Sequence, residues 1–274
     1  MTAQPSQPAQ PWAGNNHVGK NHVGNNHVGD DHALARALAD EAGRALLAER
    51  ARSGHADPGA LRKAGDRLSH ELLVARLAAA RPDDAVLSEE GADDPRRLGA
   101  ERVWIVDPLD GTREYAEAGR ADWAVHVALW ERGRLVAGAV GLPAQRRTLG
   151  TDMPPPTPVR PPGRPLRLVA SRTRAPQQVL DVAAAVGGEI LPMGSAGAKV
   201  AAVVTGAADI YVHAGGQYEW DSAAPVAVAL AAGLHATRID GSPLAYNRQN
   251  PWLPDLCVCA PALAEQVLAA IRAA

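Results

Sequence analysis

The feature that most restricts the fold is the alternation of strand-like and helix-like runs between residue 166 and the C-terminus. The strand-like runs are LRLVAS, GEILP, ADIYVH, GLHAT and DLCVCA, and helix-like runs lie between them near 175–186, 194–205, 221–233 and 261–272. Strands and helices that alternate in this way are typical of proteins in which helices cover the faces of a sheet. The pattern predicts a layered α/β sandwich.

The N-terminal half begins with two helix-like runs. Asp30 or Asp31 can cap the first, whose apolar stripe runs to Gly54, and a second helix is expected to begin near Asp66 and to end before Pro82. The runs AVLSEE and RVWIVD then have the composition of strands, and WAVHVALW and RLVAGAVG flank ERG as the arms of a hairpin. We expect an α+β half over residues 30–150.

A proline-rich segment separates the two halves. TDMPPPTPVRPPGRP, residues 151–165, contains seven prolines, which lack the backbone donors that a sheet needs. We expect a linker here and a second α/β half over 166–274. Three copies of Asn-His-Val-Gly precede residue 30, and the absence of any helix or strand periodicity predicts a disordered tail over 1–29. Its imidazoles could alternatively bind a transition metal.

The overall composition excludes several classes of function. Lys and Arg number 28 against 30 Asp and Glu, which argues against binding of a nucleic-acid polymer. No apolar run approaches the ~18 residues of a membrane span, and the polar N-terminus has no secretory pattern, so we expect a cytoplasmic protein. Cys257 and Cys259 alternate within a predicted strand and are expected to share a face as reduced core residues.

The run VWIVDPLDGT ends a strand in two carboxylates, Asp107 and Asp110. Mg²⁺ is held by several oxygen ligands, and the turn at Pro108 can bring both carboxylates to the same point. Gly111 permits close backbone approach, and Thr112 can begin a helical turn whose free N–H groups attract phosphate. An Asp-rich turn that only caps a helix would have a similar sequence, so both interpretations stay open.

Further carboxylates occupy the ends of other predicted elements. Glu89 and Glu90 follow a strand in LSEEG, Asp221 opens an Ala-rich helix in EWDSAAP, and Asp66 is placed at a helix start in KAGDRLS. Each of these could alone be a solvated turn or an ordinary helix N-cap.

The order of the segments KAGD, SEE, DPLDGT, GSAGAK and EWDSAAP, over about residues 31–274, resembles the inositol monophosphatase superfamily of Mg²⁺-dependent, lithium-sensitive phosphatases. DPLDGT matches the family element D-P-[IL]-D-G-T at each position, and WDSAA matches W-D-x-A-A. The resemblance implies alternating α-β-α-β-α layers and a protein that is often a homodimer.

The resemblance also implies a set of metal ligands, with Mg²⁺ as the cofactor. The ligands would be Glu89, Asp107 and the carbonyl of Leu109 for a first ion, Asp107, Asp110 and Asp221 for a second, and Asp66 with Glu89 for a weaker third. The reaction would then proceed without a covalent intermediate, because the metals activate water and neutralise the phosphate.

Other positions are implied to act on water and substrate. Thr112 would pair with Asp66 to orient and deprotonate the attacking water, and the backbone N–H groups of Gly111 and Thr112 would hold the phosphate. The GSAGAK segment adds Ser195 and Lys199 as substrate-binding candidates. Each follows from the matched motif.

The substrate class is indicated by three segments. VASRTR resembles the Ser-Arg-x-[HR] strand end of CysQ-type bisphosphate nucleotidases, Lys199 lies where those nucleotidases carry Lys, and YEWDSAAPVAVA keeps their Ala-Pro pair. A bisphosphate brings a second dianion that Arg172, Arg174 or Lys199 could neutralise, although solvated side chains would also fit these positions. The resemblance implies removal of the 3'-phosphate of adenosine 3',5'-bisphosphate, a small phosphate ester, with inositol 1-phosphate and fructose 1,6-bisphosphate as alternatives.

Two competing functions remain at this level. LDGT also occurs in haloacid dehalogenase-type phosphatases, but their nucleophilic Asp is replaced here by Pro108. The alternative of another class is a non-catalytic protein that binds metal through its His-containing tail, which the complete set of ligands disfavours. The chain has no Phe to stack on adenine, and Tyr115, Tyr218 and Trp220 all stay open as substitutes.

Overall fold

A computed structural model describes residues 30–173 and 175–274. The predicted tail and Arg174 lie outside these residues. The described chain contains two five-stranded sheets, with strand orders β1-β2-β3-β4-β5 and β7-β6-β8-β10-β9.

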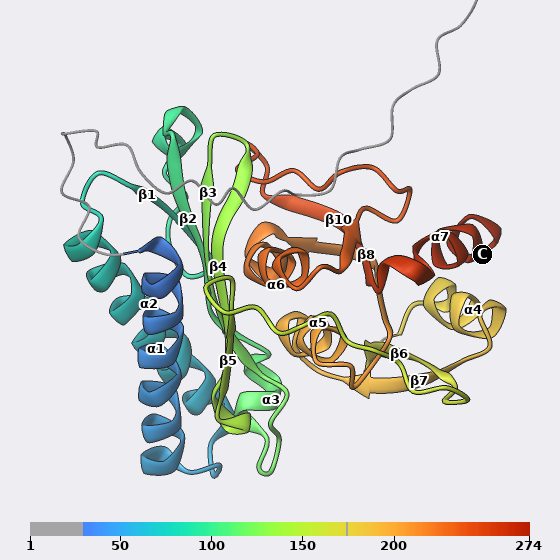
Figure 1. The fold of residues 1–274 in the computed structure, drawn as a ribbon. Helices are drawn as coiled ribbons and strands as arrows, with labels where there is room; N and C mark the ends of the chain where they lie inside the picture. The colour runs from blue at the N-terminus through green and yellow to red at the C-terminus, as the bar shows by residue number, and fades with distance from the viewer. Residues whose placement is uncertain (1–29, 174) are drawn as a thin grey trace, which may run out of the picture.

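Two long helices cover the outer face of the first sheet (Figure 1). In α1 (Asp31–Ser53), the N-cap is Asp30, whose carboxylate accepts a hydrogen bond from the backbone N–H of His32. The prediction for the start of α2 (Pro58–Ala80) was wrong. Asp57 caps this helix and Pro58 occupies its first turn, a strong start signal, so Asp66 lies in the middle of the helix.

The first sheet confirms the predicted hairpin. Its strands are β1 (Ala85–Ser88), β2 (Arg102–Asp110), β3 (Ala124–Glu131), β4 (Arg134–Leu142) and β5 (Arg147–Gly150). β1 is parallel to β2, and the other neighbours are antiparallel. The turn between β3 and β4 uses Arg132 and Gly133, both at positive φ, which suits a tight connection. Residues 30–173 and 175–274 also contain three short 3₁₀ turns, at Pro95–Gly99, Pro143–Gln145 and Pro261–Leu263.

The second sheet contains the predicted C-terminal alternation. Its strands are β6 (Leu166–Ser171), β7 (Gly188–Met193), β8 (Ile210–Tyr218), β9 (His235–Thr237) and β10 (Trp252–Cys259). The helices between and after them are α4 (Gln177–Ala185), α5 (Ala196–Val204), α6 (Glu219–Ala231) and α7 (Ala264–Ala273). Cys257 and Cys259 are buried and free, as predicted.

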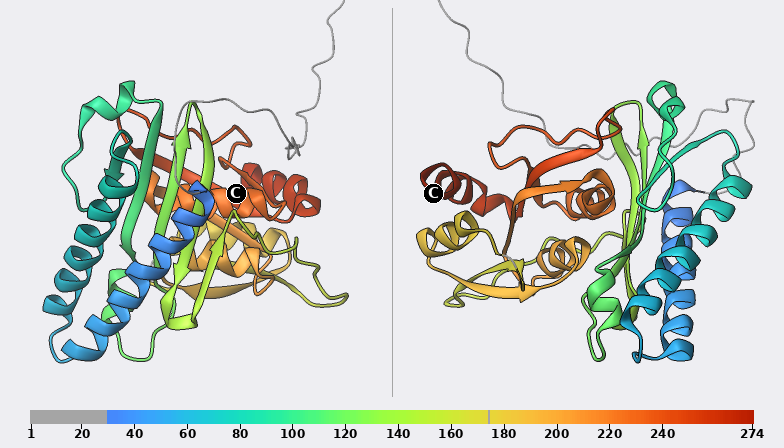
Figure 2. Two further views of the ribbon diagram at one scale, coloured as in Figure 1. Left: turned by 60° about the vertical axis from the view of Figure 1, so that its left-hand side comes forward. Right: turned by 180° about the vertical axis from the view of Figure 1, so that it is seen from behind.

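The elements form five layers, which confirms the predicted α-β-α-β-α sandwich. α5 and α6 lie between the two sheets and share one apolar core with them, in which Ile105 and Val140 of the first sheet join Tyr211 and Val258 of the second. α4 and α7 pack against each other on the far side of the second sheet. Figure 2 shows α1 and α2 on one outer side and α4 and α7 on the other.

The proline-rich segment connects the two sheets. Residues 151–165, all of them described, form neither helix nor strand. The boundaries proposed for the two halves stay a prediction, because α6 of the second half packs directly on β3 and β4 of the first.

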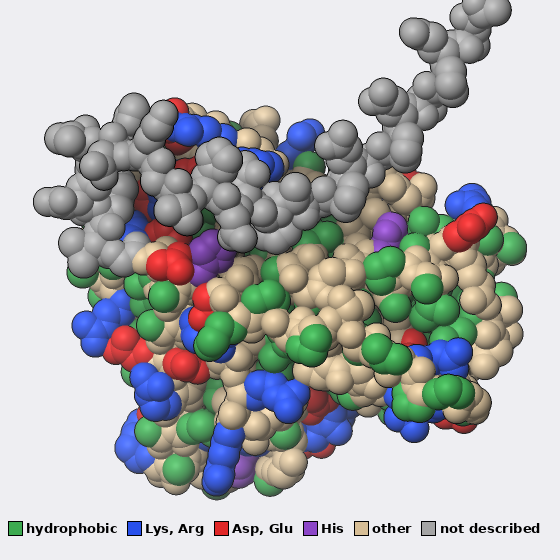
Figure 3. All heavy atoms as spheres, viewed as in Figure 1, with side chains coloured by type: hydrophobic (Ala, Val, Ile, Leu, Met, Phe, Trp, Pro, Cys, Tyr) green, Lys and Arg blue, Asp and Glu red, His purple; other side chains and the backbone are tan. Residues whose placement is uncertain are grey.

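The surface agrees with the balanced composition. On the face drawn in Figure 3, Lys and Arg side chains are interspersed with Asp and Glu, without a patch of a single sign. Within the described ranges, no helix combines the length and apolar character that a bilayer crossing requires.

Candidate active site

The end of β2 forms the base of the site. Val103 to Val106 are buried and carry the strand to Asp107, where the pairing with β3 shifts register before Asp110. The backbone N–H of Leu109 donates to Asp107 Oδ1 over 3.0 Å, which closes the predicted turn, and Leu109 itself is buried. The irregularity brings both carboxylates to one end of the strand, as the sequence predicts.

Gly111 follows at φ +83°, and α3 (Thr112–Ala116) begins directly after it. A Cβ atom at Gly111 would lie 3.0 Å from Ser195 Cβ and 3.3 Å from the backbone of Asp122 and Trp123. Both the dihedral angle and the lack of space therefore require glycine. This confirms the prediction that Gly111 permits a close backbone approach and that Thr112 begins a helical turn.

Helix α2 packs directly against this turn. Ser69 Oγ donates to the carbonyl of Pro108 over 2.6 Å, and a Cβ atom at Gly65 would lie 2.7 Å from the ring of Tyr115. Gly65 thus allows a close helix contact beside the turn, and Asp66 is the next residue of the helix.

Asp110 is held by the first turn of α5. Its Oδ2 accepts hydrogen bonds from Ser195 Oγ (2.5 Å) and the backbone N–H of Gly197 (2.7 Å), and its Oδ1 accepts one from the N–H of Ala196 (3.2 Å). Burial alone would raise the pKa of Asp110, but these donors and the nearby His126 outweigh it and hold the pKa below its usual value.

The other carboxylates interact with one another. Burial, together with the charges of Asp221 and Asp110, raises the pKa of Glu89 to about 7, although its hydrogen bond with Asp107 opposes the shift. Burial, together with the charges of Glu89, Asp110 and Asp221, raises the pKa of Asp107 well above its usual value. Burial and Asp110 raise the pKa of Asp221 to about 6. Four predicted ligands from β2, α6 and the end of β1 therefore lie close enough to influence one another's charge, although Glu89 keeps an exposed surface. Neither Glu89 nor Asp221 belongs to the tighter group of ligand atoms described below around Asp107 and Asp110.

The pKa of Asp66 is influenced by a different neighbour. Burial, then the charge of Glu90, raises its pKa to about 7, while Arg62 opposes the shift. No hydrogen bond joins Asp66 to Thr112 in the part of the chain that the structure describes. The predicted Thr112–Asp66 pair and the third metal position thus stay predictions.

The donor set of the pocket fits a hard divalent cation. Its side chains are carboxylates, the ligands that Mg²⁺ prefers, and the raised pKa values of Glu89, Asp107 and Asp221 arise first from burial and then from mutual repulsion that a cation would relieve. The protein could hold such an ion with Glu89, Asp107, Asp110 and Asp221.

The raised pKa values predict how stability depends on pH and metal. Asp66 and Glu89 hold a proton more tightly in the folded protein (pKa about 7) than in the unfolded chain (3.8 and 4.5). Their contribution to the metal-free protein is therefore full below pH ~4 and is lost as the pH rises to about 7. Because a cation binds the deprotonated pocket, we expect the gain in melting temperature on adding Mg²⁺ to be small at pH 5 and larger at pH 7.5. A gain independent of pH would contradict this assignment.

His126 is a residue of the site that the sequence did not reveal. It lies on β3 opposite Asp107, is fully buried, and places Nε2 3.2 Å from Asp110 Oδ2. Burial lowers the pKa of His126, but Asp110 and the carbonyl of Trp220 outweigh this and raise it. A metal-ligating atom from each of Asp107, Asp110 and His126 lies within 4.8 Å of the others. The only signal was a polar residue in the apolar strand WAVHVALW.

The predicted substrate-binding residues differ in the protein groups to which they are hydrogen-bonded. Ser195 caps α5 and donates to Asp110, at φ +22°. Arg172 donates to Glu114 (2.8 Å) and Glu117 (2.6 Å) of the α3 segment. Both are thus already committed to protein partners.

Of the two predicted substrate-binding cations that the structure describes, Arg172 is paired with carboxylates and Lys199 is not. The side chain of Lys199 is buried, and its Nζ lies 5.3 Å from the centre of the Tyr211 ring. No ion pair joins it to a carboxylate among the described residues. Burial lowers the pKa of Lys199, against the attraction of Asp110 and Glu114.

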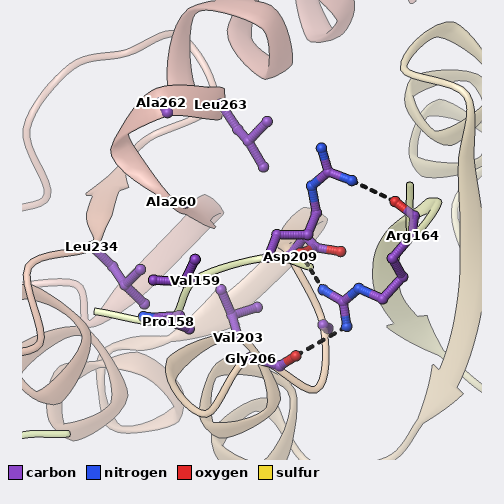
Figure 4. A pocket seen from close by; sticks show the side chains of 12 residues that line it. Pro158, Val159, Arg164, Val203, Gly206, Asp209, Leu234, Ala260, Ala262 and Leu263 are labelled. Atoms are coloured by element: carbon purple, nitrogen blue, oxygen red, sulfur yellow. Dashed lines mark hydrogen bonds and ion pairs between the residues drawn. The ribbon is translucent and has the colours of Figure 1, made fainter. Parts of the chain in front are cut away.

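A separate cavity of about 260 Å³ lies beneath the proline-rich segment (Figure 4). It is lined largely by apolar side chains such as Pro158, Val203 and Leu234, and none of the pocket carboxylates contributes to it. Its Arg164 donates to Asp209 over 2.5 Å and to the carbonyl of Gly206 over 3.1 Å. Of the charged groups that line this cavity, Arg164 and Asp209 are therefore paired with each other, while Arg160 donates to the backbone carbonyl of Arg164.

The fold and the carboxylate pocket define a layered α/β phosphatase, and comparison with known proteins agrees. A family model described as "Inositol monophosphatase family" matches residues 31–274. The chain belongs to the inositol monophosphatase family, whose enzymes are metal-dependent.

Among curated proteins, the chain is 51% identical over 252 residues to a "3'-phosphoadenosine 5'-phosphate phosphatase" of Mycobacterium leprae, covering 88% of this chain and 93% of that protein. It is 31% identical to the "3'(2'),5'-bisphosphate nucleotidase CysQ" of Escherichia coli, covering 69% and 81%. Among solved structures, CysQ from Bacteroides thetaiotaomicron superposes with a TM-score of 0.68 at 27% identity, covering 84% and 97%. An inositol monophosphatase of Staphylococcus aureus superposes with a TM-score of 0.72 at 19% identity, covering 86% and 93%, and shows the shared fold.

Proposed function

We propose that this protein is a Mg²⁺-dependent phosphatase that removes the 3'-phosphate of adenosine 3',5'-bisphosphate. The observation that carries the proposal is the buried pair Asp107 and Asp110 at the end of β2, with Glu89 and Asp221 near enough to raise the pKa of Asp107. The names of the mycobacterial and enterobacterial relatives support this substrate.

We assign the metal ligands as the family motif implies, with Asp107 shared between two ions. When bound, Mg²⁺ would lower the pKa of a water molecule and neutralise the phosphoryl oxygens. The pocket residues supply fixed oxygen ligands on rigid elements, because Asp107 belongs to a buried strand and Asp110 is tied to α5. The family motif adds a further ligand, the carbonyl of Leu109, which lies between Asp107 and Asp110 in the sequence.

We assign water activation to Thr112 and Asp66. A carboxyl group with a pKa of about 7 can accept a proton near neutral pH, which suits the role proposed for Asp66. The backbone N–H groups of Gly111 and Thr112 are the proposed contacts of the reacting phosphate.

Lys199 is the proposed partner of the second phosphate. Because it is buried and lacks an ion pair, an incoming phosphate would gain a charge-assisted hydrogen bond without displacing a carboxylate. Arg172 is assigned a supporting role, since Glu114 and Glu117 already occupy its guanidinium.

Substitution of Lys199 tests this assignment. We expect Lys199→Met to raise KM for adenosine 3',5'-bisphosphate by about 10- to 100-fold, the value of a hydrogen bond to a charged group. KM for inositol 1-phosphate, which has no second phosphate, should change less. Steady-state kinetics with both substrates measures the difference, and the exposed Lys63→Met is the matched control. Equal changes for both substrates would remove Lys199 from recognition of the second phosphate.

The three aromatic candidates for base stacking differ in their exposure. Tyr115 is fully buried and its hydroxyl donates to the carbonyl of Leu46, so it cannot stack on a base. Tyr218 is 43% exposed and stacks on Trp220 with ring centres 4.7 Å apart, next to Asp221. We assign base stacking to the Tyr218–Trp220 pair.

The reaction is tested by measuring phosphate release with Mg²⁺ from adenosine 3',5'-bisphosphate, inositol 1-phosphate and fructose 1,6-bisphosphate. We expect the highest kcat/KM for the nucleotide and inhibition by added Li⁺. A higher kcat/KM for inositol 1-phosphate or fructose 1,6-bisphosphate would overturn the substrate assignment but keep the reaction type. Failure to hydrolyse any of the three would contradict the assignment of this protein as a phosphatase.

Deletion of residues 1–29 separates the enzyme from a metal-binding tail. These residues lie outside the described chain, and no assigned ligand belongs to them. We expect the truncated protein to keep Mg²⁺-dependent phosphate release with unchanged kcat and KM. Loss of all activity in a truncated protein that still melts cooperatively would favour the tail as the functional part.

A further inference from the structure

The ring of His126 lies where three segments of the site meet. It projects from β3, opposite Asp107 of β2, and is completely buried. Its neighbours belong to the end of β2, the start of α5 and the start of α6. These segments are distant in the sequence, and each carries or holds a proposed metal ligand.

The two ring nitrogens contact different segments. Nδ1 lies 3.0 Å from the carbonyl oxygen of Trp220, and because a carbonyl only accepts, Nδ1 carries the hydrogen and donates it. Trp220 directly precedes Asp221. Nε2 lies 3.2 Å from Asp110 Oδ2, an ion-pair distance without the geometry of a hydrogen bond. One rigid ring thus spans the distance between the two segments that carry Asp110 and Asp221.

Gly197 shows how closely this ring is fitted. A Cβ atom at Gly197 would lie 2.0 Å from Nε2, so only glycine leaves room for the imidazole. The backbone N–H of Gly197 also donates to Asp110 Oδ2 over 2.7 Å. The first turn of α5 therefore holds Asp110 and confines the ring at the same place.

We propose that His126 is a positioning residue that fixes Asp110 and the Asp221 segment at the separation needed to share a metal ion. This rests on the proposed metal-binding role of those two carboxylates. The close approach of Gly197 to Nε2 leaves no space there for an ion, which favours a role through Asp110 over direct ligation. Residues that orient metal ligands typically change metal affinity by 10- to 100-fold when they are removed.

The test is Mg²⁺ binding to the full chain, measured by calorimetry without substrate. Mg²⁺ is the suitable probe because imidazoles of the tail are poor ligands for this hard cation. We expect His126→Leu, which removes both polar contacts at similar volume, to weaken Mg²⁺ binding by about 10- to 100-fold. His126→Gln, whose amide nitrogen can reach the place of Nε2, should restore part of the affinity. His235→Leu, on the distant β9, should bind as wild type does.

Unchanged Mg²⁺ affinity in a folded His126→Leu protein would overturn the proposal. Equal losses in the Leu and Gln variants, accompanied by a matching fall in metal-free melting temperature, would also overturn it, because they indicate a purely structural role. If the Leu variant does not fold, Gly197→Ala displaces the same ring and is expected to weaken Mg²⁺ binding, with Gly99→Ala, which meets open space, as its control.

The outcome is separable from the proposed function. A wild-type protein that binds Mg²⁺ without hydrolysing the nucleotide would reject the substrate and leave the role of His126 intact. A wild-type protein that does not bind Mg²⁺ would reject the metal site and, with it, this inference.

Discussion

Asp107→Asn is expected to leave the fold intact and to reduce kcat by about 10²- to 10³-fold or more, because this carboxylate is the proposed ligand of two ions and the substitution preserves its volume. Asp107 is 1% exposed and lies among three other acidic groups. Replacing it with a neutral amide also removes buried like-charge repulsion. We therefore expect the metal-free melting temperature to stay equal to that of the wild type or to rise.

Phosphate release at saturating Mg²⁺, together with thermal melts with and without metal, measures both effects. Asp152→Asn is the matched control, since Asp152 pairs with Arg36 at 2.6 Å and is not among the proposed ligands. The control should keep its activity and lose a little stability. Near-normal turnover of Asp107→Asn at saturating Mg²⁺ would reject the assignment of Asp107 as a ligand.

Thr112→Ala is expected to reduce kcat by about 10²- to 10⁴-fold, the usual contribution of proton transfer by a positioned group, with little change in KM. The hydroxyl lies at the first position of α3, directly after the Gly111 turn. Thr112→Ser keeps the hydroxyl and should retain most of the activity. A loss confined to KM would mean that Thr112 positions substrate instead of activating water.

Much of the fold follows from local patterns. The C-terminal alternation and the β3–β4 hairpin are encoded in periodicity and turn residues, which act over short stretches of chain. The start of α2 was missed because Gly59 and Gly65 weaken the helix pattern, although Asp57 and Pro58 form a good start. β8 runs further than ADIYVH predicts, through Gly215 and Gly216 at positive φ, because pairing with β10 stabilises a segment whose sequence is typical of a turn.

In the site, too, the residues fixed by local structure could be predicted from the sequence, and the tertiary contacts could not. Asp107, Asp110 and Gly111 could be placed from the sequence, because one strand and one turn determine their geometry. The partners of Arg172 could not, since Glu114 and Glu117 reach it only through tertiary packing. His126 was hidden for a related reason: its role depends on the starts of two helices that meet its ring only in the folded protein.

The most direct test of the whole account is a crystal structure of the protein grown with Mn²⁺ and adenosine 3',5'-bisphosphate, with anomalous scattering used to locate the metal. We predict anomalous peaks within coordination distance of Asp107, shared with Glu89 on one side and with Asp110 and Asp221 on the other, and a phosphate beside them. A pocket without metal in a crystal that contains Mn²⁺ elsewhere would contradict the central claim that these carboxylates form the catalytic metal site.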